Sequence, residues 1–148
     1  MYTVRRATPT DHVAIAALIA HYAMVAPVFD MASAWWVACA DDGGQVVACI
    51  GAEHGDGAWL LRSALVATSA RGHGLGRQLT TALIGAATQQ HMQCVYCFST
   101  DAGDFWQHMG FTEVPVAEVL AALPAVPQVA QFRQLGWLPT EVAWRRDL

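Results

Sequence analysis

The chain has 148 residues, enough for one domain with a substantial core, and we expect a single domain over residues 1–148. Apolar residues make up 55% and charged residues 14% of the sequence, which indicates a folded globular protein rather than a disordered one. The net charge of −4 and the absence of a basic run argue against a nucleic-acid partner, and no apolar run is long enough to span a membrane.

The N-terminal residues predict a strand followed by a helix. Residues 2–6 read as the strand, and they contain two arginines where a signal peptide would have an apolar segment, so we expect a cytoplasmic protein. Thr8 or Thr10 is placed to cap a helix that runs to about residue 23. Residues 24–33 contain Pro27 and predict a loop or a short helix.

The next segments predict an antiparallel meander. Residues 35–40 and 45–53 are strand-like, and the Asp-Asp-Gly-Gly sequence between them is typical of a hairpin. His-Gly-Asp-Gly at residues 54–57 is a second turn signal, and residues 58–67 return as a third strand.

A glycine-rich turn, Arg71-Gly72-His73-Gly74-Leu75-Gly76, joins this third strand to a helix over residues 77–90. The helix is predicted from apolar residues at helical spacing, namely Leu75, Leu79, Leu83 and Ala87. Free N–H groups in the first turn of a helix favour a bound phosphate, and glycines let the backbone approach it closely. The turn therefore predicts an anion site, with packing of the turn as the alternative.

The spacing of this turn separates it from other phosphate-binding loops. The chain contains no lysine, so a P-loop is excluded, and the Gly-x-Gly-x-x-Gly dinucleotide pattern is not met. The pattern that fits is Arg-x-x-Gly-x-Gly at positions 71, 74 and 76.

The following segments predict a strand, a short helix and another strand. Residues 94–99 form the first strand, which a right-handed crossover would place parallel and adjacent to the strand of residues 58–67. Residues 101–104 begin a short helix over 105–109, Gly110 ends it, and residues 111–114 follow as a strand. Strand alternation directs Cys94 and Cys97 to opposite faces, so this CxxC pair predicts no metal site.

Two motifs in order carry a family resemblance. The Arg-x-x-Gly-x-Gly turn and the segment Phe105-Trp106-Gln107-His108-Met109-Gly110-Phe111 together resemble the pyrophosphate loop and the closing Phe-Tyr-x-x-x-Gly-Phe segment of the GNAT N-acetyltransferases. The resemblance implies a mixed α/β (α+β) fold, with a mostly antiparallel central sheet, a splayed parallel pair in its middle, and flanking helices. Leu61-Arg62-Ser63 and parts of the tail look like the arsenic-resistance N-acetyltransferase branch, although Leu138-Pro139 stands where that branch tends to have Cys-Pro.

The resemblance also implies acetyl-CoA as co-substrate, no metal, and a set of cofactor-binding residues. Backbone groups of Leu65 and Val66 would pair with the pantetheine arm, and Trp106 would pack near its sulfur. The pyrophosphate would bind the turn formed by Arg71, Gly72, His73, Gly74, Leu75, Gly76 and Arg77.

The motifs say less about the catalytic groups than about the cofactor-binding residues. Glu53 is the candidate base that deprotonates the acceptor amine, with a solvent-facing charge as the alternative. The family's tyrosine, which protonates the leaving thiolate, is replaced by Trp106. Tyr96, Ser99 or Thr100 would then serve as the acid, or the thiolate leaves unassisted.

The acceptor side is predicted to include Arg62, Ser63 and Thr100. A buried guanidinium needs a carboxylate, and for Arg62 this is either Glu53 or the carboxylate of an amino-acid-like substrate. We expect a small-molecule amine as acceptor, with a protein N-terminus or lysine, or a non-catalytic acyl-CoA sensor, as alternatives. A further alternative is an interaction module that forms a homodimer through a face made of four tryptophans, Trp35, Trp36, Trp137 and Trp144.

Overall fold

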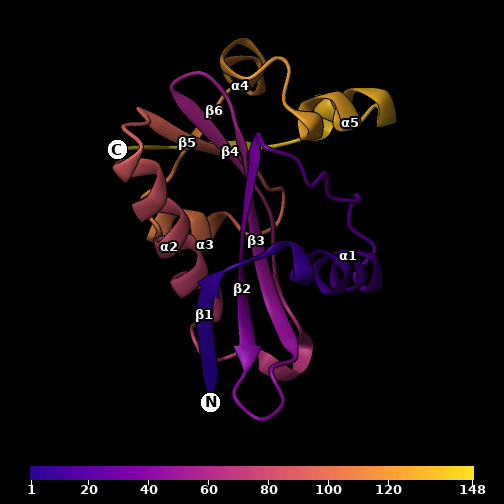
Figure 1. Cartoon of the computed structure of the whole chain (residues 1–148). Helices are drawn as coiled ribbons and strands as arrows, with labels where there is room; N and C mark the ends of the chain where they lie inside the picture. The colour runs from indigo at the N-terminus through magenta and orange to yellow at the C-terminus, as the bar shows by residue number, and fades with distance from the viewer. The chain divides into compact units, whose positions relative to one another are not determined.

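The computed structural model describes all residues from 1 to 148, and seven of its segments form one mixed sheet (Figure 1). The strands lie in the order β1-β2-β3-β4-β5-β7-β6, with β4 and β5 parallel and the pairs β1–β2, β5–β7 and β6–β7 antiparallel. Their bounds are β1 Tyr2–Arg6, β2 Ser33–Ala40, β3 Val46–His54, β4 Ala58–Val66, β5 Cys94–Phe98, β6 Thr112–Val114 and β7 Ala143–Asp147. This sheet, with one parallel pair in its middle and helices in the connections, confirms the predicted fold class.

Five α-helices occur in the chain, and none is long and apolar enough to cross a bilayer. They are α1 His12–His21, α2 Leu75–Gln89, α3 Gly103–His108, α4 Val116–Ala122 and α5 Pro127–Leu135. Short 3₁₀ turns occupy Pro9–Asp11, Thr68–Ala70 and Leu138–Thr140. The predicted helical spacing of α2 is confirmed, because Leu75, Leu79, Leu83 and Ala87 are all nearly inaccessible to solvent.

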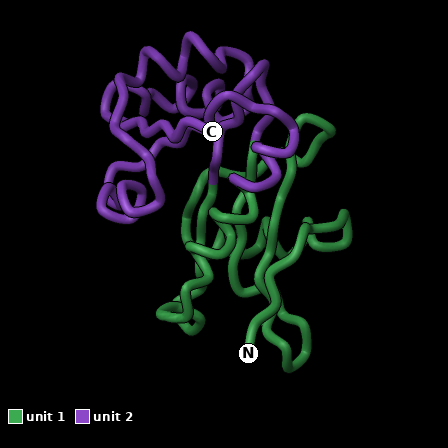
Figure 2. Tube along the Cα trace, turned by 90° about the vertical axis from the view of Figure 1, so that its left-hand side faces the viewer, with its two compact units in different colours: residues 1–52, 63–83 green, residues 53–62, 84–148 purple.

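The chain divides into two compact units, which Figure 2 colours separately. The first comprises residues 1–52 and 63–83. Its apolar cluster joins Ile15 and Ile19 of α1 to side chains of β2, β3 and β4, among them Trp35, Cys49 and Leu65. The indole of Trp35 lies over Gly51, where an added Cβ would come within 2.7 Å of the ring, so glycine is needed for this packing.

The second unit comprises residues 53–62 and 84–148. Its core places α4 and α5 against the paired parts of β4 and β5, with Val119, Leu123 and Val129 packed on Leu60 and Tyr96. The short helix α3 ends before Gly110, whose φ of +87° is a conformation that glycine adopts readily, as expected for the residue after a helix.

The structure adds elements that the sequence analysis did not place, and it corrects one expectation. The added elements α4, α5 and β7 all lie after residue 114. The proposed four-tryptophan dimer face is wrong, because Trp35, Trp36 and Trp144 are buried and Trp137 alone is substantially exposed. Buried indoles stabilise the monomer's own core and offer no surface to a partner.

Candidate functional site

The parallel pairing of β4 with β5 stops part-way along β4. The paired residues run from Ala58 opposite Cys94 to Leu61 opposite Cys97, whereas β4 continues to Val66. Ser63 follows shortly after the last pair, is buried, and has a φ of +54°. A non-glycine residue with positive φ inside a strand interrupts the ladder and bends the strand. The backbone of β4 beyond Leu61 therefore has groups that β5 does not use.

Ser63 is held in this conformation by neighbouring strand β3. The Cys49 thiol donates a hydrogen bond to the Ser63 carbonyl at 3.4 Å, and the Cys49 side chain is fully buried. Strained backbone of this kind costs roughly 1–3 kcal/mol and is retained where the surroundings enforce it. The bend at Ser63 is thus a built feature of the site. The family resemblance implied that the parallel pair splays apart, and the structure locates the bend at Ser63.

The glycine-rich turn has the open backbone that a bound phosphate requires. Gly72 and Gly74 have φ values of +83° and +74°, and a Cβ added at either would meet nothing within 4 Å. The packing explanation for these two glycines therefore has no support, because no neighbour excludes a side chain there. The turn needs glycine for its conformation, and it leaves free space above its backbone.

The first turn of α2 supplies unpaired donors at this turn. The first hydrogen bond of the helix runs from the Gln78 N–H to the Gly74 carbonyl at 3.0 Å. The N–H groups of Leu75, Gly76 and Arg77 precede it and have no acceptor within the helix. Together with the positive end of the helix dipole they fit a diphosphate, so the residues present match the predicted acyl carrier.

Arg71 connects this turn to the end of β4. Its Nε donates a hydrogen bond to the Val66 carbonyl at 3.1 Å, and its guanidinium lies 5.8 Å from the centre of the Tyr22 ring. The Tyr22 hydroxyl in turn accepts a hydrogen bond from the Thr68 N–H at 2.7 Å. Of the other predicted cofactor residues in this unit, His73 contacts the ring of Tyr2, and the Leu65 side chain is buried. Leu65 can therefore offer a ligand only its backbone.

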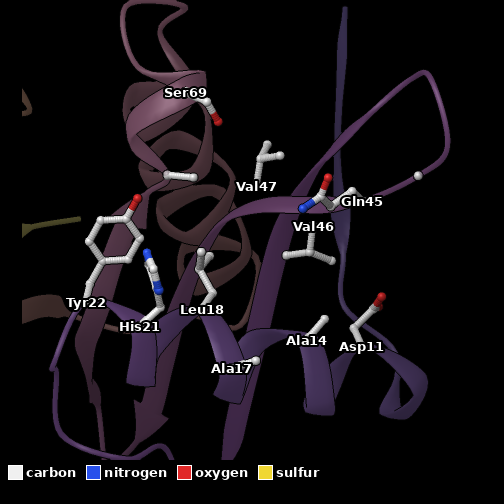
Figure 3. A pocket seen from close by; sticks show the side chains of 12 residues that line it. Asp11, Ala14, Ala17, Leu18, His21, Tyr22, Gln45, Val46, Val47 and Ser69 are labelled. Carbon is white, nitrogen blue, oxygen red and sulfur yellow. The ribbon is translucent and has the colours of Figure 1, made fainter.

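An open cavity of about 660 Å³ lies in the same unit, between α1 and the start of β3 (Figure 3). Ala14, Ala17 and Leu18 form one wall, Val46 and Val47 another, and Asp11 lies at one end. The volume is within the range of small-molecule sites. However, the Asp11 carboxylate accepts hydrogen bonds from both terminal nitrogens of Arg5, so it is already engaged within the protein.

Glu53 and Arg62, two of the predicted functional residues, bind each other. Arg62 Nη1 lies 2.8 Å from Glu53 Oε2, and their side chains are 0% and 1% exposed. Arg62 Nη1 also donates to the Gln131 side-chain oxygen at 3.0 Å, and the Gln128 N–H donates to Glu53 Oε1 at 2.8 Å. The geometry corresponds to the alternative in which Glu53 is the carboxylate partner of Arg62.

The hydroxyl of Tyr96 donates to the Glu118 carboxylate at 2.9 Å, and Glu118 also binds Arg145. Burial, together with the hydrogen bond to Glu118, raises the pKa of Tyr96 well above its ordinary value. A phenol in this state releases its proton less readily than an exposed one. Ser99 lies just beyond β5 and is partly exposed, and Thr100 next to it is exposed, so both are more accessible than Tyr96.

Trp106 lies on α3 with its ring edge-on to Phe105 and Phe111, at centroid distances of 4.9 and 5.3 Å. The residue is 5% exposed, and its buried Nε1 has no hydrogen-bond partner. The indole therefore combines an apolar surface with one unused donor. An unused buried donor is uncommon and is consistent with a ligand that completes it.

The sequence analysis gave no role to two polar residues of α5, Gln128 and Gln131, which contact the buried ion pair. Gln131 carried only part of the resemblance of the tail, and its contact with Arg62 depends on the packing of α5.

Comparison with known proteins identifies the domain type. Residues 32–113 match the family model described as "Acetyltransferase (GNAT) domain". No curated protein matches the chain.

Solved structures share the fold over the whole chain. The Mycobacterium tuberculosis protein Rv2747, in complex with CoA and NLQ, has a TM-score of 0.76 at 23% identity, covering 99% of both chains. N-acetylglutamate synthase from Neisseria gonorrhoeae, complexed with coenzyme A and N-acetyl-glutamate, has a TM-score of 0.77 at 18% identity. That match covers 100% of this chain and 35% of the synthase, so this chain spans about a third of it.

A protein-modifying enzyme is also among the similar structures. The ribosomal-protein-S18-alanine N-acetyltransferase from Escherichia coli has a TM-score of 0.67 at 16% identity, covering 77% of this chain and 79% of that one. Identities this low show that the fold is shared, and they do not identify the acceptor.

Proposed function

The chain belongs to the GNAT acetyltransferase family, whose model covers more than half of it, and on this premise we propose that it acetylates a small, amino-acid-like amine. Acetyl-CoA supplies the acetyl group as a thioester. The acceptor amine attacks the thioester carbonyl directly, the new C–N bond forms, and the C–S bond breaks to release free CoA. The observation that carries the proposal is the open glycine turn at the start of α2, which follows directly on a strand that β5 accompanies only as far as Leu61.

The chain's own groups would hold the acyl carrier at two places. The first-turn N–H groups of Leu75, Gly76 and Arg77 would bind the diphosphate, and Arg71 would keep the turn attached to β4. Backbone groups of Leu65 and Val66 would pair with the pantetheine arm. A backbone N–H in this part of β4 would also polarise the thioester oxygen, which needs no special side chain.

The proton route would use few side chains. Because Tyr96 is bound to Glu118, we propose Ser99 or solvent, rather than Tyr96, for protonating the leaving thiolate. Thiolates leave readily, so the reaction does not depend on a strong acid at this point. We keep Glu53, which is paired with Arg62, as the candidate that takes the amine proton through solvent. Trp106 would pack at the sulfur of the cofactor.

The packing of α5 against Arg62 and Phe98 supports a small acceptor. Gln131 and Phe132 of α5 contact Arg62 and Phe98, the residues that follow the last paired positions of β4 and β5. Burial of Arg62 under this helix favours a compact, polar acceptor over a long polypeptide. The Arg62-Ser63 pair and Thr100 would lie on the acceptor side. The finer likeness to the arsenic-resistance branch makes arsenical amino acids worth including among acceptors.

A second candidate is acetylation of a protein N-terminus, which the similarity to the Escherichia coli ribosomal-protein enzyme favours. A third is a non-catalytic acyl-CoA sensor. We further propose a cytoplasmic protein, and any homodimer would have to use surfaces other than the buried tryptophans.

The test combines cofactor binding with acceptor screening. Calorimetric titration with CoA should give saturable binding, and release of free thiol from acetyl-CoA should be stimulated by amino acids in a panel of glycine, L-alanine, L-methionine, L-glutamate and an arsenical amino acid. CoA binding without stimulation by any amine would favour the sensor. Stimulation only by peptides would favour the protein-modifying enzyme, and no CoA binding would overturn the acyl-carrier assignment.

A further inference from the structure

Helix α1 ends at Tyr22 in a fixed conformation. The Met24 N–H donates to the Ile19 carbonyl at 3.1 Å, and the Ala23 N–H donates to the Ala20 carbonyl at 3.0 Å. These two bonds form the paired pattern of a Schellman cap. Ala23 has a φ of +55°, a conformation that is unfavourable for alanine and is retained where the surroundings enforce it. The cap therefore fixes how the backbone carries Tyr22.

The Tyr22 side chain binds the segment that leads from β4 into the glycine turn. Its hydroxyl accepts a hydrogen bond from the Thr68 N–H at 2.7 Å and lies 3.1 Å from the Thr68 hydroxyl. This hydroxyl is directed away from α1 (Figure 3). Hydrogen bonds from the Thr68 hydroxyl and N–H, together with the charge of Arg71, lower the pKa of Tyr22 below its ordinary value. The phenol oxygen thus acts as an acceptor for a segment that lies far along the chain.

The ring of Tyr22 also contacts Arg71. The guanidinium carbon lies 5.8 Å from the ring centre, which is within the range of a cation–π contact. Arg71 Nε donates to the Val66 carbonyl, whereas the two terminal nitrogens make no hydrogen bond or ion pair within the protein. These nitrogens form a planar pair of donors that matches the oxygens of a phosphate. All of these residues belong to the first compact unit.

The contacts of Tyr22 fall at both ends of the short 3₁₀ turn Thr68–Ala70, which Arg71 follows directly. The residue before this turn is held by β3, because the Ala67 N–H donates to the Val47 carbonyl at 2.8 Å. The two hydrogen-bonding contacts between Tyr22 and the turn are exposed to solvent. Water can replace such bonds, so they add little to the stability of the fold. Their main effect is on the position of the turn.

We infer that Tyr22 is a positioning residue for the acyl carrier, which holds residues 68–71 at the end of α1 and keeps the Arg71 guanidinium beside the glycine turn for a diphosphate oxygen. The inference rests on the proposed function and adds a residue that lies outside both family motifs. An exposed arginine without such contacts loses rotamer freedom when a ligand binds it. A guanidinium that the ring of Tyr22 already holds loses less, so the diphosphate binds more tightly.

Calorimetric titration with CoA tests the inference. Tyr22→Leu removes both the hydroxyl and the ring, and it should raise the Kd of CoA about tenfold. Tyr22→Phe keeps the ring beside Arg71, and it should raise the Kd about threefold. Tyr2→Phe is the matched control, because it removes a hydroxyl that makes no hydrogen bond in the same unit and keeps the ring contact with His73. Its Kd should equal that of the wild type.

A double-mutant cycle with Arg71→Gln separates positioning from a general structural role. Arg71→Gln should itself weaken CoA binding, because the charge is lost. In that background Tyr22→Leu should change the Kd less than twofold, because the group that Tyr22 positions is gone. A residue that only stabilised the fold would cause the same tenfold loss in both backgrounds. In steady-state kinetics Tyr22→Phe should raise the KM of acetyl-CoA and leave kcat within about twofold.

Wild-type CoA affinity in a folded Tyr22→Leu variant, or equal losses in the two backgrounds, would overturn the inference and leave the proposed function intact. If Tyr22→Leu does not fold, Tyr22→Phe takes its place in the cycle, and its threefold loss should disappear in the Arg71→Gln background. Absence of CoA binding to the wild-type protein would instead remove the proposed function and this inference with it.

Discussion

Arg62 Nη1 lies 2.8 Å from Glu53 Oε2 in a setting where both side chains are almost completely buried. Both residues were candidates for contact with the acceptor, and the structure joins them to each other and to α5. A buried pair of this kind need not add much stability as a whole, but breaking it leaves one uncompensated charge. The pair therefore links the fold of the second unit to the function proposed for it.

We predict that Glu53→Ala lowers the free energy of unfolding by about 3–5 kcal/mol, because Arg62 is left buried without its carboxylate. Glu53→Gln should cost less, since it keeps an acceptor for the guanidinium. Urea denaturation measures both, with Glu113→Ala on exposed β6 as the control. A loss below 1 kcal/mol in Glu53→Ala would show that solvent reaches Arg62 when the carboxylate is removed.

A second prediction separates structure from substrate binding at Arg62. If Arg62 also binds the acceptor, Arg62→Lys should raise the KM of the acceptor far more than the KM of acetyl-CoA. Lysine keeps the charge but loses the planar array of donors. Steady-state kinetics with each substrate varied in turn provide the measurement. Equal changes in the two KM values would restrict Arg62 to a structural role.

The glycine turn and α2 were predictable from sequence because both depend on local chemistry. Leu75, Leu79 and Leu83 recur at helical spacing, and Gly72 and Gly74 have the positive φ that the turn requires. The parallel pairing of β4 and β5 followed from the handedness of the crossover between them.

The family resemblance implied a splayed parallel pair, but the residue at which β4 bends was not predictable, because Ser63 gives no local sign of a positive φ that neighbouring strands impose. The sequence also did not allow the helices after residue 114 to be placed. The short helices α4 and α5 are stabilised by packing on Leu60 and Tyr96, which are far away in sequence. The buried side-chain oxygen of Gln128, which has no hydrogen-bond partner, is a consequence of that packing, so it too required the structure.

Gly74→Ala is predicted to weaken CoA binding at least tenfold. The φ of +74° costs an alanine roughly 1–2 kcal/mol, and the new methyl group projects into space that is open for the diphosphate. Gly85→Ala is the matched control, because it lies in the exposed middle of α2 with nothing within 4 Å of an added Cβ. It should stabilise the helix by about 1 kcal/mol.

Calorimetric titration with CoA and thermal unfolding of both variants provide the measurement. Equal CoA affinity in Gly74→Ala and Gly85→Ala would contradict a diphosphate site at this turn.

Trp106→Phe should retain kcat within about threefold, because an indole donates no proton and phenylalanine keeps most of the packing against Phe105 and Phe111. Trp106→Tyr restores the family's acid and should make kcat fall at high pH, as a phenol ionises near pH 10. The measurement is the pH dependence of kcat, with Trp137→Phe on the exposed surface as control. Loss of turnover in a folded Trp106→Phe would assign a direct role to the indole N–H.

The last prediction concerns acid stability of the first unit, where Asp11 closes one end of the cavity beside α1. Both of its oxygens accept hydrogen bonds from Arg5, at 2.7 and 2.9 Å, and its Oδ2 also accepts one from the Thr8 N–H. The hydrogen bonds from Arg5, opposed in part by burial, hold the pKa of Asp11 well below its ordinary value. The unfolded chain therefore binds a proton at Asp11 more readily than the folded one.

Because the pKa is depressed in the folded state, this contribution to stability is fully present above the ordinary pKa of about 4 and is lost progressively as the pH falls below it. Asp11→Asn should lower the urea midpoint at pH 7 and should lose less stability than wild type between pH 5 and about pH 2.5. Asp42→Asn, in the exposed turn between β2 and β3, should follow the wild-type curve. A parallel acid loss in Asp11→Asn and wild type would show that Arg5 does not hold this carboxylate in solution.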